Sequence, residues 1–180
     1  MKSKIILLNG VSSSGKTTVG KAIQNLSDDT YFLLGLDTTF EMLPEKSKGD
    51  LKYVDMALSN LHKLIYNLAK DEANLIVDHL IVREEEIREL ITLNKEFEIY
   101  FIKIDCDLQI INKREIERGN RKIGLAEIQR KKIDKYVDYD LTIDTTIFSP
   151  ETNAQTIIQF ISNNEPKAMK KMVQRYKIQV

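Results

Sequence analysis

Hydrophobic residues gather in five short stretches that are spread along the chain. Each stretch is nearly continuous in aliphatic and β-branched residues, a pattern typical of strands that are buried on both faces of a parallel sheet. The stretches are KIILLN (4–9), YFLLGL (31–36), NLIVDH (74–79), FEIYFIKID (97–105) and YDLTID (139–144). We therefore expect a central sheet of five parallel strands.

The segments between these stretches have the residue pattern of helices. A further helix is predicted after Ser149-Pro150, where a hydroxyl cap precedes a proline in the first turn. Because strand and helix alternate, the chain is predicted to form a doubly wound α/β fold with helices on both faces of the sheet. The other expected helices are Lys16–Leu26, Leu51–Lys70, Glu84–Leu93, Leu108–Arg118 and Leu125–Lys135.

The length of 180 residues is that of a single domain with one substantial core. We expect this domain to span residues 1–165, because the sequence contains no repeat or low-complexity segment. The last stretch, PKAMKKMVQRYKIQV (166–180), is basic and follows a polar break. It is expected to be either a docked helix or a loose tail.

The overall charge is balanced, with 27 basic and 27 acidic residues. No general attraction to nucleic acid or to an anionic membrane follows from that balance. Cys106 is the single cysteine, which excludes an internal disulfide and suits a reducing cytoplasm. No apolar run approaches the roughly 20 residues that span a bilayer. We expect a cytoplasmic protein with neither nucleic-acid nor membrane partners; the oligomeric state is left open.

A phosphate-binding loop is predicted directly after the first strand. Gly10, Gly15, Lys16 and Thr17 match the pattern G-x-x-x-x-G-K-[ST] between a strand and a helix. Such a loop offers backbone N–H groups and a helix N-terminus to a multiply charged phosphate, and its glycines allow close approach. A simple turn is the alternative. The residues expected to bind the phosphates are Gly10, Val11, Ser12, Ser13, Ser14, Gly15, Lys16, Thr17 and Thr18.

A nucleotide switch protein is less well supported than a kinase. Asn94-Lys95 has only the first half of a guanine-reading N-K-x-D motif, and it precedes a strand. No D-x-x-G follows a strand at the position of a γ-phosphate sensor. A kinase needs a base near the acceptor hydroxyl, a carboxylate near Mg²⁺ and cations over the transferring phosphoryl group.

The chain offers a candidate for each of these needs. Asp37 and Asp78 lie at the ends of the second and third strands, where ligands bind in open α/β sheets. Arg114, Arg118 and Arg121 surround a glycine, and the first two share one helical face. Lys16 is expected to reach the β- and γ-phosphates and the Thr17 hydroxyl to ligate Mg²⁺, together with Asp78.

Each of these candidates also has a purely structural interpretation. Asp37 could cap a short helix that starts at Thr38, and Asp78 could be a structural acid beside the loop. The arginines, interleaved with Glu115 and Glu117, could form a solvated face of salt bridges.

Together, these segments resemble the chloramphenicol phosphotransferase-like family of P-loop kinases. The resemblance runs in order over most of the chain. It rests on LNGVSSSGKTT, GLDTTFEMLP (35–44), LIVDH (75–79), CDLQIINKREIERGNRKIGLA (106–126) and YDLTIDTTIFSPET (139–152). The second and fourth elements are far more selective than the phosphate loop alone.

The resemblance implies transfer of the γ-phosphoryl group of ATP to an alcohol on a small molecule, with Asp37 as the base. It also implies an arginine-bearing lid over about 114–126, in which Arg114 and Arg118 contact the nucleotide. Lys16, Arg118 and Arg121 would then stabilise the transferring charge.

Two departures separate the chain from the chloramphenicol enzymes of that family. The segment after Pro44 is shorter and more polar, and Asp78-His79 stands where the family has paired aspartates. An antibiotic such as chloramphenicol is therefore one candidate acceptor. A nucleoside or nucleotide kinase is the alternative enzyme, and an NTP-binding regulatory protein is the alternative outside enzymes.

Overall fold

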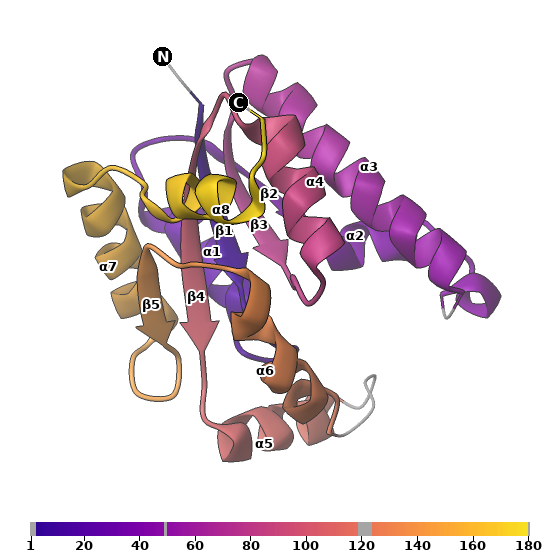
Figure 1. The fold of residues 1–180 in the computed structure, drawn as a ribbon. Coiled ribbons are helices and arrows are strands. Elements are labelled where there is room, and N and C mark those ends of the chain that lie inside the picture. The colour runs from indigo at the N-terminus through magenta and orange to yellow at the C-terminus, as the bar shows by residue number, and fades with distance from the viewer. Residues whose placement is uncertain (1–2, 49, 119–123, 180) are drawn as a thin grey trace.

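Five parallel strands form one sheet in the computed structural model of the chain, which describes residues 3–48, 50–118 and 124–179 (Figure 1). The strand order is β2-β3-β1-β4-β5, so the first strand lies at the centre of the sheet. The strands are β1 (Lys4–Asn9), β2 (Tyr31–Gly35), β3 (Asn74–His79), β4 (Glu98–Asp105) and β5 (Leu141–Asp144). The predicted five-stranded parallel sheet is confirmed.

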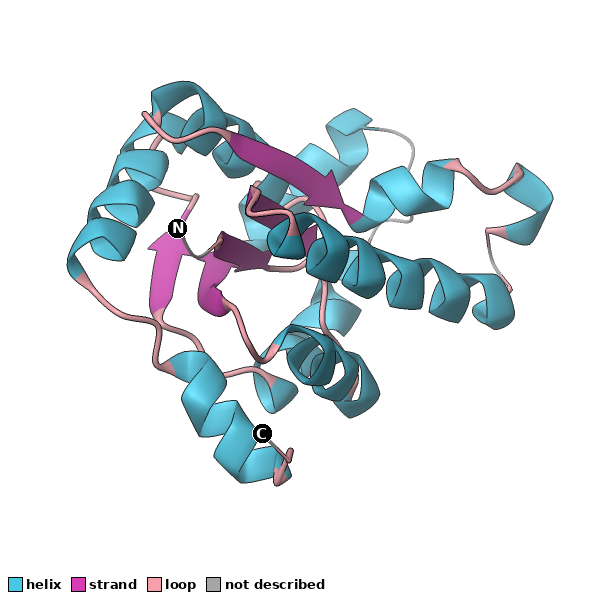
Figure 2. Ribbon diagram, turned by 90° about the horizontal axis from the view of Figure 1, so that it is seen from above, coloured by secondary structure: helices cyan, strands magenta, loops and turns pink. Residues whose placement is uncertain are grey.

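Helices cover both faces of this sheet (Figure 2). One face is packed by α1 and α7, and the other by α3, α4 and α8. The helices are α1 (Lys16–Leu26), α2 (Leu36–Glu41), α3 (Leu51–Lys70), α4 (Glu84–Asn94), α5 (Leu108–Arg118), α6 (Leu125–Tyr136), α7 (Pro150–Asn163) and α8 (Ala168–Tyr176), with a 3₁₀ turn at Glu45–Ser47.

The central strand shows why its sequence is apolar without alternation. Ile5 and Leu7 point into the core beneath α3, α4 and α8, whereas Ile6 and Leu8 point into the core beneath α1 and α7. All four side chains are fully buried. A strand covered on both faces needs apolar residues at every position. The continuous hydrophobic run therefore indicates a strand that is buried on both faces.

The chain leaves the sheet at the carboxyl ends of its strands, where α5 and α6 form a separate layer (Figure 1). A small core of its own joins these helices to the phosphate loop, and its buried residues are Val11, Cys106, Ile111, Ala126 and Ile133. The expected lid of 114–126 begins on α5 and ends on α6, and its residues 119–123 lie outside the described part of the chain.

The basic C-terminal stretch forms a docked helix. The side chains of Met169, Met172 and Tyr176 on α8 are buried against the sheet. The Asp140 carboxylate accepts bonds from the backbone N–H groups of Lys167 and Ala168, and so satisfies donors at the start of this helix.

Three strand ends differ from the expectation, of which the smallest is the start of the fourth strand at Glu98 instead of Phe97. The second strand stops at Gly35, and Leu36 already belongs to α2. The fifth strand begins at Leu141, and just before it the Asp140 carboxylate accepts bonds from the N–H groups of Phe101 on β4 and Ala168 on α8. No helix in the described residues is long and apolar enough to cross a membrane.

Candidate active site

The loop between β1 and α1 curls around a left-handed backbone conformation at two residues. Ser13 has φ = 59° and Gly15 has φ = 100°. Such alternation makes successive N–H groups converge into a concave anion-binding nest. The loop leads directly into α1, whose N-terminus adds a positive partial charge behind it. The predicted loop thus lies between a strand and a helix and has left-handed residues at Ser13 and Gly15.

Gly10 is the more tightly packed of the two glycines in this loop. A Cβ atom there would lie 2.6 Å from the Ile104 carbonyl oxygen and 2.6 Å from Ser14 Oγ. Gly10→Ala is therefore expected to lower the free energy of unfolding by about 1–3 kcal/mol and to weaken nucleotide binding. Urea unfolding and ATP titration measure both effects.

Gly35→Ala is the matched control for this substitution. Gly35 has an extended backbone, and an added Cβ would have no neighbour closer than 3.8 Å. We expect Gly35→Ala to leave the free energy of unfolding and the affinity for ATP nearly unchanged. Equal effects of the two substitutions would contradict the packing account of Gly10.

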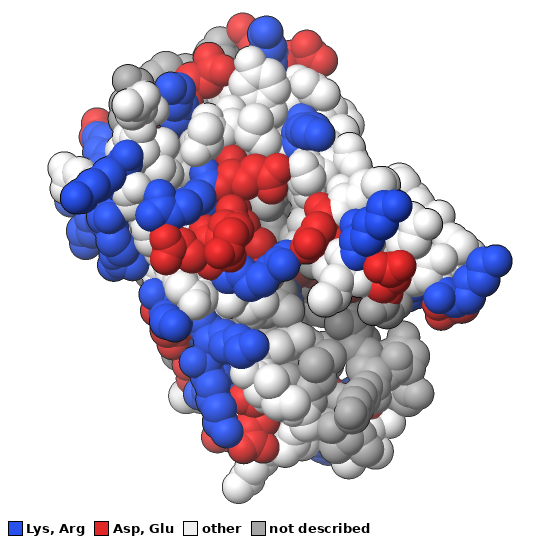
Figure 3. All heavy atoms as spheres, turned by 45° about the vertical axis from the view of Figure 1, so that its right-hand side comes forward, with Lys and Arg blue, Asp and Glu red and all other residues white. Residues whose placement is uncertain are grey.

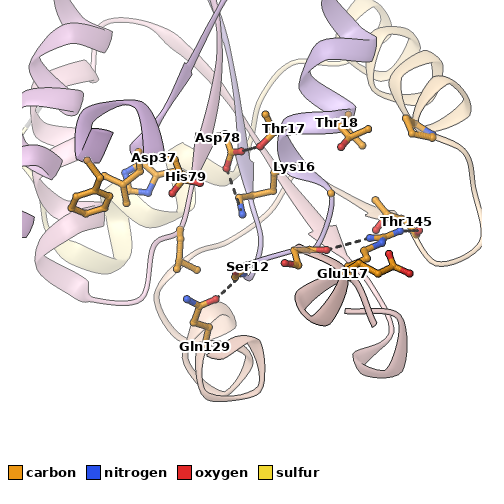
Figure 4. A pocket seen from close by; sticks show the side chains of 18 of the residues that line it. Ser12, Lys16, Thr17, Thr18, Asp37, Asp78, His79, Glu117, Gln129 and Thr145 are labelled. Atoms are coloured by element: carbon orange, nitrogen blue, oxygen red, sulfur yellow. Dashed lines mark hydrogen bonds and ion pairs between the residues drawn. The ribbon is translucent and has the colours of Figure 1, made fainter. Parts of the chain in front are cut away.

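Lys16, Thr17 and Asp78 meet where β3 ends beside the loop (Figure 4). The Lys16 ammonium lies 3.4 Å from Asp78 Oδ1, and it donates to the Val11 carbonyl oxygen at 3.1 Å. The Thr17 hydroxyl donates to Asp78 Oδ2 at 2.5 Å. The carboxylate therefore touches both the cation and the hydroxyl that the motif assigns to phosphate and metal.

This arrangement suits Mg²⁺ in its donor chemistry. A hydroxyl and a carboxylate oxygen are hard ligands, and Mg²⁺ in phosphoryl-transfer sites takes only one or two protein ligands beside phosphate and water. Among the described residues no group of three or more His, Cys, Asp and Glu side chains could hold a metal ion by itself. Thr17 and Asp78 are the residues here whose oxygen atoms could hold such an ion together with phosphate oxygens.

Arg114 is the arginine of the lid segment whose side chain the structure describes. It donates to the carbonyl oxygens of Ser13 at 3.3 Å and Thr145 at 3.1 Å, and so reaches the phosphate loop from α5. Arg118 is the last residue of α5, and its side chain lies outside the described part. Arg121 also lies outside it.

Asp37 lines the same cavity as the phosphate loop. The cavity measures about 710 Å³, and Leu36, Phe40 and Leu80 line it near Asp37. Figure 4 shows Asp37 and His79 on one side of Asp78, with Thr17 on the other. The N-cap of α2 is Gly35, and Asp37 lies within the first turn, so the capping role weighed from the sequence is not observed.

Three residues of the cavity wall were not identified from the sequence. Gln129 on α6 accepts a hydrogen bond from the Ser12 backbone N–H at 2.7 Å. Thr145 donates from its hydroxyl to the Ser14 carbonyl oxygen at 2.6 Å, and Phe148 also lines the cavity. These contacts join positions more than 100 residues apart, and no local motif signals them.

His79 is buried and is hydrogen-bonded to a second buried histidine. Its Nε2 lies 3.0 Å from Nε2 of His62, whose Nδ1 lies 2.9 Å from Glu89 Oε2. An ionised carboxylate only accepts, so His62 Nδ1 carries a proton; neutral His62 then accepts at Nε2 from His79. Burial lowers the pKa of His79 to about 3, the adjacent His62 ring adds to the shift, and the Leu80 backbone opposes it. Burial also lowers the pKa of His62, against the opposing effect of Glu89.

This pair makes the stability of the fold sensitive to acid. In the unfolded chain a histidine takes up a proton below about pH 6.5, whereas folded His79 stays neutral down to about pH 3. Between these two values, each unit by which the pH falls therefore lowers the free energy of unfolding by about 1.4 kcal/mol. Urea unfolding of the wild type and of His79→Asn at pH 7, 6 and 5 measures this slope.

We expect the free energy of unfolding to depend less steeply on pH in His79→Asn than in the wild type. The difference in slope corresponds to the uptake of about one proton on unfolding. The carboxylates contribute equally to the slopes of both proteins, so their contribution cancels when the slopes are subtracted. Parallel slopes would show that His79 is not held neutral in the folded state.

Charges of both signs lie on the described part of the face seen in Figure 3. Asp and Glu side chains gather near the middle of this face, and Lys and Arg side chains lie around them.

Comparisons with known proteins agree with this geometry. The model of the family described as "Chloramphenicol phosphotransferase-like protein" matches residues 3–162. A relative from Mycobacterium tuberculosis (strain ATCC 25618 / H37Rv), "Putative O-phosphotransferase Rv2636", is 24% identical, with 81% of this chain and 76% of the relative covered.

Solved structures with the same fold include three proteins from different bacteria. APS kinase CysC of Mycobacterium tuberculosis in complex with AMPPNP and APS has a TM-score of 0.70 at 16% identity, covering 90% of this chain and 99% of that one. The tunicamycin resistance protein of Deinococcus radiodurans has a TM-score of 0.66 at 16% identity, covering 92% and 99%. Shikimate kinase of Acinetobacter baumannii in complex with shikimate has a TM-score of 0.60 at 18% identity, covering 92% and 96%.

The structural neighbours establish the fold of a P-loop kinase, and the family match extends over nearly the whole chain. The protein therefore belongs to the chloramphenicol phosphotransferase-like family and is a P-loop kinase, a phosphotransferase.

Proposed function

We propose that the protein transfers the γ-phosphoryl group of ATP to a hydroxyl group of a small molecule, with Asp37 as the base. The observation that carries this proposal is the shared cavity. Asp37 lines one part of it and the phosphate loop with Lys16 lines another. A base and a phosphate cradle in one cavity allow an alcohol to be placed in line with the γ-phosphorus.

The reaction proceeds by a single displacement. The Asp37 carboxylate accepts the proton of the acceptor hydroxyl, and the alcohol oxygen forms a bond to the γ-phosphorus. The bond from that phosphorus to the β–γ bridging oxygen breaks, and ADP leaves with the electron pair. Little covalent chemistry falls to the protein, so alignment and charge neutralisation account for most of the catalysis.

The remaining groups neutralise charge on the phosphates. Lys16 exchanges its bonds to Asp78 and the Val11 carbonyl for the β- and γ-phosphates. Thr17 and Asp78 would hold Mg²⁺, which when bound withdraws charge from the phosphate oxygens. Arg114 already reaches the loop, and we assign Arg118 and Arg121 to the transferring phosphoryl group, with lid closure over it.

The test is ADP release by the purified protein with Mg·ATP, measured with and without hydroxylated compounds. Chloramphenicol, other hydroxylated antibiotics and nucleosides form the first panel. We expect stimulation by at least one compound and its loss in Lys16→Ala. Tight ATP binding without stimulation by any alcohol would favour the alternative of a regulatory NTP-binding protein.

A further inference from the structure

Gln129 is a polar residue of α6 that lines the cavity beside the phosphate loop. Its carboxamide has an acceptor, Oε1, and two N–H donors on Nε2. The Ser12 backbone N–H can only donate, so the amide atom that it meets at 2.7 Å is the oxygen. This bond fixes the orientation of the amide, with Nε2 on the other branch (Figure 4). None of the described residues accepts a hydrogen bond from Nε2.

One peptide group connects this amide to Lys16. Its N–H, that of Ser12, donates to Gln129 Oε1. Its carbonyl oxygen, that of Val11, accepts from Lys16 Nζ at 3.1 Å. The N–H and C=O of a trans peptide lie in one plane and point in opposite directions, so the amide and the ammonium flank the same peptide. Because the motif assigns Lys16 to the β- and γ-phosphates, Gln129 lies at the terminal-phosphate end of the loop.

The amide also lies on the acceptor side of the lysine. Figure 4 shows Gln129 and Asp37 on one side of Lys16, and Thr145 on the other. All four residues line the same cavity. In the proposed reaction the γ-phosphoryl group passes from the loop to an alcohol held at Asp37. Gln129 thus flanks the region in which the group is transferred.

The packing of α6 holds the amide in place. Ala126 and Ile133 are spaced three and four residues from Gln129, so the three side chains share one helical face. Ala126 and Ile133 are buried in the small core that also contains Val11 of the loop. At the start of the helix, the buried Glu115 carboxylate accepts from the Ala126 N–H at 3.3 Å. A packed helix therefore presents Gln129 to the loop, as preorganised donors require.

We propose that Gln129 is a further catalytic residue: its Nε2 group donates a hydrogen bond to an oxygen of the γ-phosphoryl group, while Oε1 keeps its bond from Ser12. This inference rests on the proposed function and adds an uncharged donor to its cations. Negative charge is spread over the phosphoryl oxygens during transfer, and a fixed donor aimed at them needs no rearrangement. No bond to Gln129 forms or breaks. The alternative is a structural role, in which only Oε1 acts by holding the loop.

Two substitutions separate the donor of this amide from its acceptor. Gln129→Glu keeps an oxygen for the Ser12 N–H and removes the donors, whereas Gln129→Met has a similar length and removes both functions. Calorimetric titration with Mg·AMPPNP and with Mg·ADP gives a ratio of affinities that reports on the γ-phosphate, which only AMPPNP carries. We expect both substitutions to lower the affinity for AMPPNP relative to that for ADP by about 10–100-fold, the effect of a lost hydrogen bond to a charged group.

Lys131→Gln is the matched control. Lys131 is exposed on the same helix and does not line the cavity. Its substitution changes the net charge by the same amount and sign as Gln129→Glu. We expect the ratio of affinities in Lys131→Gln to match that of the wild type. An unchanged ratio in either Gln129 variant would overturn the inference, because a structural role alone does not distinguish AMPPNP from ADP.

Failure of this inference differs from failure of the proposed function. The ratio of affinities is measured without an acceptor, so it does not depend on which alcohol is phosphorylated. If the function is wrong, no hydroxylated compound stimulates ADP release by the wild type. If only the inference is wrong, an alcohol stimulates ADP release, and a Gln129 variant has the same ratio of affinities as the wild type.

Discussion

Asp37→Asn is expected to lower kcat by about 10²–10⁴-fold, the range that general base catalysis contributes. Asparagine has nearly the same shape and fills the same part of the cavity, but it cannot accept the hydroxyl proton. Because Asp37 lies on α2 and is not part of the phosphate loop, the affinity for ATP should stay close to that of the wild type. Steady-state ADP release and ATP titration measure the two quantities.

The matched control is Glu41→Gln, which removes a carboxylate from the exposed end of the same helix. Glu41 does not line the cavity, so we expect a turnover near that of the wild type. Near-normal kcat in Asp37→Asn would contradict the assignment of the base. An equal loss in both variants would point to the fold of α2 instead.

Lys16→Ala is expected to lower kcat by about 10²–10³-fold or more, since one preorganised charge donor at the transferring group is removed. It should also weaken ATP binding, in contrast to Asp37→Asn. In the folded protein this side chain is buried and pairs with Asp78. The substitution therefore also leaves Asp78 without its neighbouring cation.

Lys21→Ala provides the control on the same helix, because Lys21 is exposed and lies outside the cavity. Calorimetric titration with ATP and the kcat of each variant separate binding from transfer. ATP affinity and kcat that both match those of Lys21→Ala would contradict the role of Lys16 at the phosphates.

The fold follows closely from the sequence where the signals are local. The helices Lys16–Leu26, Leu51–Lys70 and Leu108–Arg118 have the predicted bounds. The helix after Ser149 begins where its cap predicts, and the Ser149 hydroxyl accepts from the Thr152 N–H at 3.1 Å. Hydrophobic runs and caps act within a few residues, so a single chain displays them.

The strand ends were less well predicted because distant partners set them. Tyr139 and Asp140 were expected in the fifth strand, which begins at Leu141. The Asp140 carboxylate accepts from N–H groups of β4 and α8, and its backbone N–H donates to the Phe101 carbonyl oxygen at 2.8 Å. No pattern within 139–144 reveals partners that lie some 27 and 39 residues away along the chain.

In the candidate site, too, the residues with a local sequence signal were predicted and those set by distant contacts were not. The phosphate loop was found from its motif, and Asp78 from its place at a strand end beside the loop. Gln129 and the His62–His79 pair have no sequence signature, because one contact joins a helix to the phosphate loop and the other joins a helix to a strand. The roles of all these residues stay predictions: Asp37 as the base, Lys16 and the loop at the phosphates, Thr17 and Asp78 at Mg²⁺, and Arg114, Arg118 and Arg121 in the lid.

The most direct test of the account is detection of the phosphorylated alcohol itself. The wild type and Asp37→Asn are incubated with Mg·ATP and the acceptor that stimulates ADP release, and ³¹P NMR follows the γ-phosphoryl group. The account predicts a phosphate monoester in the wild type and almost none in the variant, although both bind ATP equally. Inorganic phosphate as the only product of the wild type, or equal monoester from both proteins, would contradict it.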